Sequence, residues 1–308
     1  MYASYQVIHQ YETENGVSPT GLYFNKLMSL LHRDLRNRGH DLKLPHCWYQ
    51  YGDEVVRSWM PEQIVWSHDA VDRTVVSWAG PKPHRQVGKG LESEIHGTVV
   101  ELGARYKDIE KAVDAVYSYA PFPFQKQFRK ARQLYGSGAN KIIAAKSPEL
   151  ISKAVVDAFK VFPTKEFPEP ANYARLVSAA TTAVLDEAPQ RLQLVNDLCE
   201  KYWNFFCYHL RLHLKGHENV PGEALDIWSQ KLAPERANYE LDLQLHLTQA
   251  MSAVPSLKEQ DQFIPWVSAS QYTKEQVARI LKEAGPAFEG LDKFTKAARR
   301  GYGKTFAA

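Results

Sequence analysis

The stretch that decides the fold lies near the start of the chain. Residues 18–39 read SPTGLYFNKLMSLLHRDLRNRG. Thr20 is a residue type that caps helix starts, and Gly39 is one that ends helices. Lys26, Arg33 and Arg36 share one side of the predicted helix, over residues 22–38. The apolar side carries Tyr23, Phe24, Leu27, Leu30, Leu31 and Leu35 at helical spacing.

Short β-rich segments follow this helix. An aromatic run ends in Trp48-Tyr49-Gln50-Tyr51-Gly52. Residues 63–67 and 74–78 are then rich in β-formers and flank a polar connection, which predicts a hairpin. An earlier helix is expected over residues 5–14, before the turn pair Asn15-Gly16. Two helices and a hairpin in this order are compatible with a winged-helix-like module.

The rest of the chain is expected to be helical. Prolines at 163, 168 and 170 predict a stiff connector, and Gly80-Pro81 predicts a boundary. The fold class is therefore mostly α, with a winged-helix-like N-terminal module that contains one hairpin and then a multi-helix array. The expected parts are the module 1–85, a helical region 86–162 with a basic segment, and a helical domain 171–308. Helices are expected over 91–106, 107–119, 125–134, 148–161, 173–185, 189–215, 222–231, 234–253, 274–284 and 287–299.

Composition places the chain among cytoplasmic globular proteins. It has 308 residues, of which 44% are apolar, and seven are Trp, enough for a substantial core. No apolar run is long enough to span a membrane, and the first residues lack the pattern of a signal peptide. Three cysteines, at 47, 199 and 207, fit a reducing compartment. We expect a cytoplasmic protein with no membrane partner.

Residues 5–57 carry a resemblance to a known family. The matching positions are Lys26, Leu27, Leu30 and Leu31, and then Tyr51, Gly52, Val55 and Val56. This part of the chain resembles the Panacea (SocA-like) antitoxin domain, although Met28 and Asp53 depart from the pattern, which has Leu and Pro there. The resemblance implies a non-enzymatic, antitoxin-like or defence-associated protein that acts by binding a protein partner.

The predicted helix offers a candidate surface for that partner. Asp34 falls on the leucine side, with Arg38 four residues later, so the two can pair. A lone buried carboxylate is costly, so Asp34 is expected to be paired or solvated. Lys26, Asp34, Arg38 and Tyr51 are the partner-binding candidates; the alternative is that the pair only marks the helix edge.

The string His32-Arg33-Asp34-Leu35 matches part of a kinase catalytic loop. Its context does not: Gly39 stands where the metal-binding Asn belongs, and the other kinase motifs are absent from the sequence. No nucleophile elbow supports a catalytic triad either. We therefore predict no catalytic residues.

Histidines offer an alternative function as a metalloprotein. His209, His213 and His217 recur every four residues near the end of the expected helix 189–215. Two histidines four residues apart on one helical face can converge on Zn²⁺. The plainer interpretation is that they close the end of a core face. No cofactor is expected, with Zn²⁺ as the alternative.

A basic segment offers nucleic acid as a second alternative partner. Residues 115–147 contain six basic residues and no acidic one. Phe122, Phe124 and Phe128 interleave with the charges, and aromatic rings can stack on unpaired bases. The same rings at helical spacing are expected more often in a core, with the charges solvated. The candidate phosphate contacts are Lys126, Arg129, Lys130, Arg132 and Lys141, together with a basic C-terminal tail over 293–304.

Overall fold

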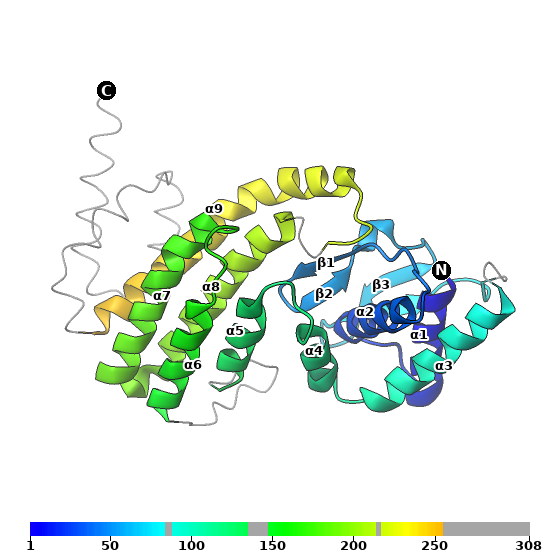
Figure 1. The fold of residues 1–308 in the computed structure, drawn as a ribbon, viewed down its shortest axis with the longest axis horizontal. Coiled ribbons are helices and arrows are strands. Elements are labelled where there is room, and N and C mark those ends of the chain that lie inside the picture. Colours follow the sequence, from blue (N-terminus) through cyan, green and yellow to red (C-terminus); the bar gives the residue numbers. More distant parts are fainter. Residues whose placement is uncertain (84–87, 135–146, 214–216, 255–308) are drawn as a thin grey trace. The chain divides into compact units, whose positions relative to one another are not determined.

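The computed structural model describes residues 1–83, 88–134, 147–213 and 217–254 (Figure 1). It is mostly helical, with two small antiparallel hairpins near the N-terminus, and this confirms the predicted fold class. The chain divides into two compact units. Unit 1 comprises Met1–Lys126 and Phe206–Leu232, and unit 2 comprises Gln127–Phe205 and the residues from Ala233 onward. Each unit is thus assembled from two separate stretches of chain.

The two predicted N-terminal helices are present in unit 1. They are α1 (Tyr2–Asn15) and α2 (Gly21–Asn37). Gly16 ends α1 in the left-handed conformation, at φ 70°. The Thr20 hydroxyl oxygen accepts a hydrogen bond from the Tyr23 backbone N–H at 3.2 Å, so the predicted cap of α2 is confirmed.

Helix α2 forms the centre of unit 1. It packs against α1, both hairpins, α3 (Lys89–Arg105) and α4 (Ile109–Tyr117). Its leucine side is buried as predicted. Lys26 corrects one detail: it was expected on the polar side, yet it is fully buried. Neighbours surround α2 on more than one side, so the helix has no continuous solvated face at this position.

One hairpin was predicted and a second was not. Strands β3 (Ile64–His68) and β4 (Thr74–Trp78) pair antiparallel and confirm the predicted hairpin. Strands β1 (His46–Tyr49) and β2 (Gly52–Val55) form the other, with His46 opposite Val55. Gly52, Asp53 and Glu54 have low β propensity, so this strand depends on tertiary contacts, such as the Val55 N–H that donates to Asn25 Oδ1 at 3.2 Å. A short 3₁₀ turn, Arg57–Trp59, follows β2.

Unit 2 is helical throughout its described part. Helices α5 (Pro123–Leu134), α8 (Leu192–Leu212) and α9 (Gly222–Ser252) contribute residues to both units. Helices α6 (Pro148–Lys160) and α7 (Pro168–Glu187) belong to unit 2, and a 3₁₀ turn over Pro189–Arg191 precedes α8. The core is aromatic: Phe128 stacks on Trp203 with ring centroids 5.6 Å apart.

Prolines account for two corrections to the predicted helices. Pro168 and Pro170 were assigned to a connector, but they open α7, because proline is tolerated where backbone N–H groups have no helical acceptor. Two helices were predicted around Pro234, but α9 runs continuously through it. Apolar residues before and after it, including Ala224 and Leu243, are buried, and their packing offsets the lost backbone hydrogen bond. The helices expected at 274–284 and 287–299 lie outside the described residues.

Within the described ranges, no helix combines the length and the apolar character needed to cross a bilayer.

Glycine substitutions test the packing of the unpredicted hairpin. Gly52 has φ +94°, and a Cβ there would lie 3.0 Å from Tyr117 Cε2. We expect Gly52→Ala to destabilise the chain by more than about 1 kcal/mol, because it combines backbone strain with a clash. Gly97 within α3 is the matched control: an added Cβ meets nothing within 4 Å, so Gly97→Ala should stabilise by about 0.5–1 kcal/mol. Urea unfolding measures both, and equal midpoints for the two variants would contradict the hairpin packing.

Candidate functional site

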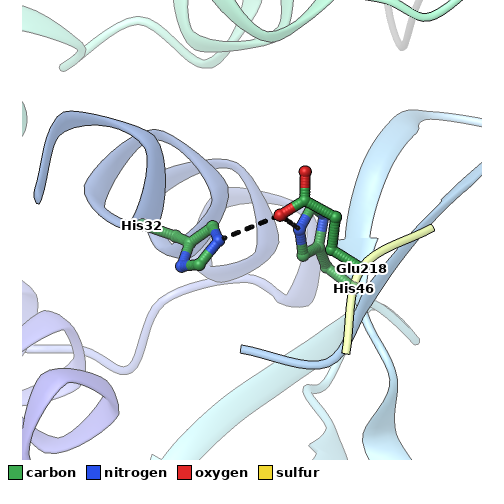
Figure 2. A group of neighbouring side chains, drawn as sticks. All are labelled: His32, His46 and Glu218. Carbon is green, nitrogen blue, oxygen red and sulfur yellow. Dashed lines mark ion pairs between the residues drawn. The ribbon is translucent and has the colours of Figure 1, made fainter. Parts of the chain in front are cut away.

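Three side chains from distant parts of the sequence meet in unit 1 (Figure 2). They are His32 from α2, His46 from β1, and Glu218 from the segment between α8 and α9. His32 Nε2 lies 3.6 Å from Glu218 Oε2, and His46 Nε2 lies 3.5 Å from the same oxygen. Of the His, Cys, Asp and Glu side chains in the described ranges, these three form the group whose candidate ligand atoms all lie within 4.8 Å of one another.

Backbone contacts hold Glu218 in this position. The His46 N–H donates to Glu218 O at 3.0 Å, and the Glu218 N–H donates to His46 O at 3.1 Å. The two residues therefore form an antiparallel bridge with their side chains on the same side. The next residue, Asn219, has φ 51° and donates from Nδ2 to Leu44 O at 3.2 Å. A short segment is thus fixed against the strand that carries His46.

The two histidines are buried, but their facing nitrogens lack hydrogen bonds. His32 is 3% exposed and His46 is 7% exposed. Neither nitrogen of His32 has a hydrogen-bond partner among the described residues, nor has His46 Nε2. Buried polar atoms in folded proteins are nearly always hydrogen-bonded, so three unsatisfied nitrogens beside one carboxylate need an explanation.

The surroundings shift the pKa values of these histidines in opposite directions. Burial and the nearby His46 lower the pKa of His32, although Glu218 opposes them. Burial also acts to lower the pKa of His46, but the hydrogen bond and charge of Asp53, together with Glu218, outweigh it and raise that pKa. The lowered pKa favours the neutral form of His32, which is the form that binds metal ions, whereas the raised pKa favours a proton on His46.

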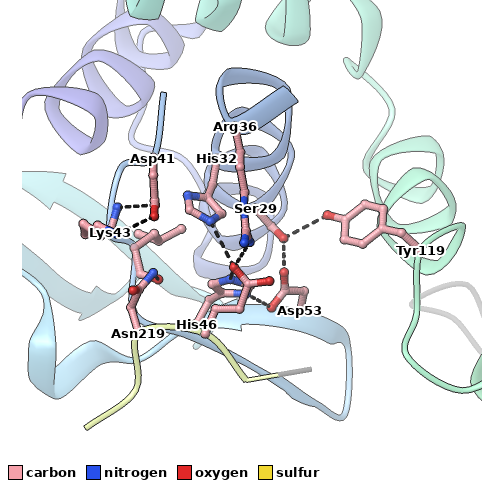
Figure 3. Close-up of polar contacts among 11 residues, drawn as sticks. Ser29, His32, Arg36, Asp41, Lys43, His46, Asp53, Tyr119 and Asn219 are labelled. Carbon is pink, nitrogen blue, oxygen red and sulfur yellow. Dashed lines mark hydrogen bonds and ion pairs between the residues drawn. The ribbon is translucent and has the colours of Figure 1, made fainter. Parts of the chain in front are cut away.

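Behind His46 lies a chain of buried hydrogen bonds (Figure 3). His46 Nδ1 lies 2.7 Å from Asp53 Oδ1, and the other Asp53 oxygen accepts from the Ser29 hydroxyl. Ser29 Oγ in turn lies 2.9 Å from the Tyr119 hydroxyl oxygen. Lys26 Nζ donates to the Asp53 carbonyl at 2.7 Å. The hydrogen bond to Asp53 engages His46 Nδ1, and the other ring nitrogen, Nε2, faces Glu218.

On its other side the group reaches solvent. The Glu218 side chain is 39% exposed, and Arg36 Nη1 contacts its Oε2. Arg36 itself is 53% exposed. Asp41 and Lys43 pair with each other at 2.7 Å and so largely cancel one another's charge. The group therefore has a buried side formed by the two histidines and a solvent-exposed side that carries Arg36.

Part of the geometry is compatible with a metal site. Tetrahedral Zn²⁺ with nitrogen and oxygen ligands at roughly 2.0–2.2 Å separates two ligand atoms by about 3.4 Å. The 3.6 and 3.5 Å between the histidine nitrogens and Glu218 Oε2 are close to that separation, and the candidate ligand atoms of the two histidines lie within 4.8 Å of each other. Two imidazoles and a carboxylate also form a common catalytic zinc ligand set, which leaves one coordination position open.

Ser29, Asp53 and His46 do not form a catalytic triad, although their residue types match one. Asp53 lies between the other two, and the Ser29 hydroxyl bonds to Asp53 and Tyr119. A triad needs the histidine to contact the serine as its base. The serine here supports the carboxylate instead.

The predicted partner-binding residues lie in different environments. Lys26 is fully buried, whereas Tyr51 is 62% exposed in the turn between β1 and β2. The expected pair between Asp34 and Arg38 is absent. Arg38 instead lies 3.8 Å from Glu94 and 3.9 Å from Glu101 on α3, and Asp34 has no ion pair among the described residues. Packing of α3 against α2 supplies acids that the helical projection of α2 alone could not include.

The predicted histidine cluster does not keep its helical spacing. The helix expected to reach residue 215 ends at Leu212, so His213 and His217 lie beyond it. The His213 ring packs edge-on against Phe122 with centroids 5.7 Å apart, and the His217 ring packs near Trp228. Burial lowers the pKa of His217 to about 4. The residue that follows His217, Glu218, belongs to the candidate site instead.

The basic segment is partly solvated. Lys126 and Lys130 are exposed on α5, while Arg129 and Arg132 are half-buried. The interleaved rings of Phe122, Phe124 and Phe128 are buried, so they are not available to stack on bases. Arg132 lies over the Trp203 ring at 5.8 Å. Lys141 and the tail 293–304 lie outside the described residues.

Sequence reasoning missed the group of His32, His46 and Glu218. His32 was noted only within the kinase-like string, and no local spacing connects it to the other two. Comparison with known proteins adds no assignment, since no family model, no curated protein and no solved structure matches this chain. The candidate site therefore depends on its own geometry.

The chain of hydrogen bonds behind His46 can be tested through Tyr119. Tyr119→Phe removes the hydroxyl that contacts Ser29, and we expect it to destabilise the chain by about 0.5–1.5 kcal/mol, the usual net value of one hydrogen bond. Tyr51→Phe is the matched control, because Tyr51 is 62% exposed and should change stability very little. Urea unfolding of both variants makes the comparison. Equal stability of Tyr119→Phe and the wild type would show that this hydrogen bond contributes nothing to the free energy of unfolding.

Proposed function

We propose that this protein binds a divalent transition-metal ion, Zn²⁺ in the first place, through unit 1. The ligand atoms are His32 Nε2, His46 Nε2 and Glu218 Oε2. The observation that carries the proposal is the convergence of two buried imidazole nitrogens without hydrogen bonds on one carboxylate oxygen, at 3.6 and 3.5 Å. Mixed imidazole and carboxylate ligands suit Zn²⁺ and the neighbouring transition metals better than Mg²⁺ or Ca²⁺.

The supporting contacts favour an ion in the same way. Metal-binding histidines almost always donate their second ring N–H to a carboxylate or carbonyl, which orients the ring. Asp53 takes this role for His46 at 2.7 Å, and Asp53 is itself buried and held by Ser29. An ion at this point would tie residues 217–219 to α2 and β1.

A proton is the competing occupant. A protonated His46 could lie between Asp53 and Glu218, and the raised pKa of His46 agrees with this. A proton on His46 would leave both nitrogens of His32 unsatisfied, however, whereas an ion would engage His32 Nε2 as well. The ion therefore accounts for more of the unsatisfied atoms than the proton does.

Metal binding should be measurable on the full chain after treatment with a chelator. We expect one Zn²⁺ per chain in a competition titration with a chromophoric chelator. Glu218→Gln and His32→Gln should weaken binding by more than about 100-fold, because loss of an outer-shell partner alone costs roughly 10–100-fold. Zn²⁺ at 100 times its dissociation constant should stabilise the wild type by about 2.7 kcal/mol.

Two controls locate the ion. His68→Ala removes an exposed histidine on β3 and should leave the affinity unchanged. His209→Ala tests the helical cluster predicted from the sequence. Loss of binding in His209→Ala, with full binding in His32→Gln, would move the ion to that cluster and contradict the proposed site. Absence of tight Zn²⁺ binding in the wild type would leave the proton as the occupant.

Binding of a protein partner, as the Panacea resemblance implies, stays a prediction. Tyr51 is accessible for such a role at 62% exposure, and Lys26 is not. Nucleic-acid binding through α5 also stays a prediction, with Lys126 and Lys130 as its exposed charges. Neither interpretation conflicts with a metal ion in unit 1.

A further inference from the structure

We propose that the open coordination position takes a small oxyanion, a carboxylate or a phosphate group, held jointly by the metal ion and by Arg36. This inference rests on the proposed metal site and adds the chemical class of its ligand. It begins from Arg36, whose guanidinium contacts Glu218 Oε2, the same oxygen that both histidines approach.

Arg36 differs from its neighbours on α2 in having Glu218 as its sole ion-pair partner within the described part of the chain. Arg33 lies over the Tyr119 ring at 4.0 Å, and Arg38 contacts Thr98 at 3.2 Å beside two glutamates. If an ion takes the Glu218 carboxylate, Arg36 loses its counter-charge. The Arg36 guanidinium would then lie next to a carboxylate whose negative charge is shared with the metal ion.

The local charges favour an anion at that point. A divalent ion, Arg36 and Lys26 together carry four positive charges, while Glu218 and Asp53 supply two negative ones. Both histidines are neutral when they bind a metal. Asp41 contributes little, because it is paired with Lys43 at 2.7 Å. A further negative charge between the ion and Arg36 would reduce this positive excess.

Access and geometry agree with this position. His32 and His46 are buried, whereas the side chains of Glu218 and Arg36 are 39% and 53% exposed. The exposed edge of the group is therefore the one formed by Glu218 and Arg36, and we place the fourth position of a tetrahedral ion at that edge. A guanidinium presents two parallel N–H donors that match two oxygens of a carboxylate or phosphate. An oxyanion can give one oxygen to the ion and the others to Arg36.

The test uses the full chain loaded with Co²⁺, whose visible spectrum reports a change of ligand at the metal. Acetate and inorganic phosphate are titrated separately at constant ionic strength, set with sodium perchlorate. We expect a saturable spectral change with at least one of the two anions. Arg36→Gln should weaken the binding of that anion by about 10-fold or more, since a hydrogen bond to a charged group contributes about that factor to the affinity. Arg36→Lys keeps the charge and loses the paired donors. Its anion affinity should lie between that of the wild type and that of Arg36→Gln.

Arg38→Gln is the matched control. It removes a positive charge two residues away, directly after the end of α2, and Arg38 contacts α3 instead of Glu218. Its anion affinity should equal that of the wild type. A second measurement compares the Co²⁺ affinity of Arg36→Gln with that of the wild type, and the difference should change sign when anion is added. In perchlorate buffer without acetate or phosphate, Arg36→Gln should bind Co²⁺ more tightly than the wild type, because a positive charge has been removed. With saturating acetate or phosphate, the wild type should bind Co²⁺ more tightly than Arg36→Gln.

The outcomes separate this inference from the proposed function. If Co²⁺ binds with the spectrum of a protein site but neither anion alters it, or Arg36→Gln responds like the wild type, the anion site is wrong and the metal site stands. If the wild type fails to bind Co²⁺ and Zn²⁺, both proposals are wrong. If Arg38→Gln weakens anion binding as much as Arg36→Gln does, the effect comes from general surface charge and a specific contact with Arg36 is contradicted.

Discussion

Burial of the Asp53 carboxylate is the constraint on which the rest of unit 1 depends. Asp53 is 2% exposed, and a buried charge is tolerated only with close partners. His46 and Ser29 bond to its two oxygens, and Lys26 donates to its carbonyl. These partners join α2 to the hairpin β1–β2. The same contacts orient the His46 ring, so the packing of the core and the geometry of the candidate site have one origin.

Asp53 and Glu218 flank His46 but have different roles. Asp53 is saturated by hydrogen bonds deep in the unit, and it can only orient its neighbours. Glu218 is partly exposed, and two histidines and an arginine approach one of its oxygens. Metal-binding histidines commonly have such a buried carboxylate behind the ring, so this arrangement is compatible with the proposed metal site.

The residues that carry the Panacea resemblance belong mostly to the core of unit 1. Leu27, Leu31 and Val55 are buried, and Gly52 lies against Tyr117 where a side chain would clash. Asp53, where the sequence departs from the family pattern, is the residue that orients His46. The positions on which the predicted resemblance depends therefore take part mainly in packing between α2 and the hairpin β1–β2, and the resemblance itself stays a prediction.

The sequence by itself determined the features that arise from neighbouring residues. Thr20 caps α2, Gly16 ends α1, and alternating β-formers define β3 and β4, because caps, left-handed turns and strand patterns act over a few residues. Tertiary structure alone decided that weak β-formers would pair as β1 and β2, that α9 would continue through Pro234, and that Arg38 would turn to α3. It alone also brought Glu218 to His32 and His46. No local pattern encodes a contact between segments so far apart in the chain, since that contact depends on how the folded elements bury one another's surfaces.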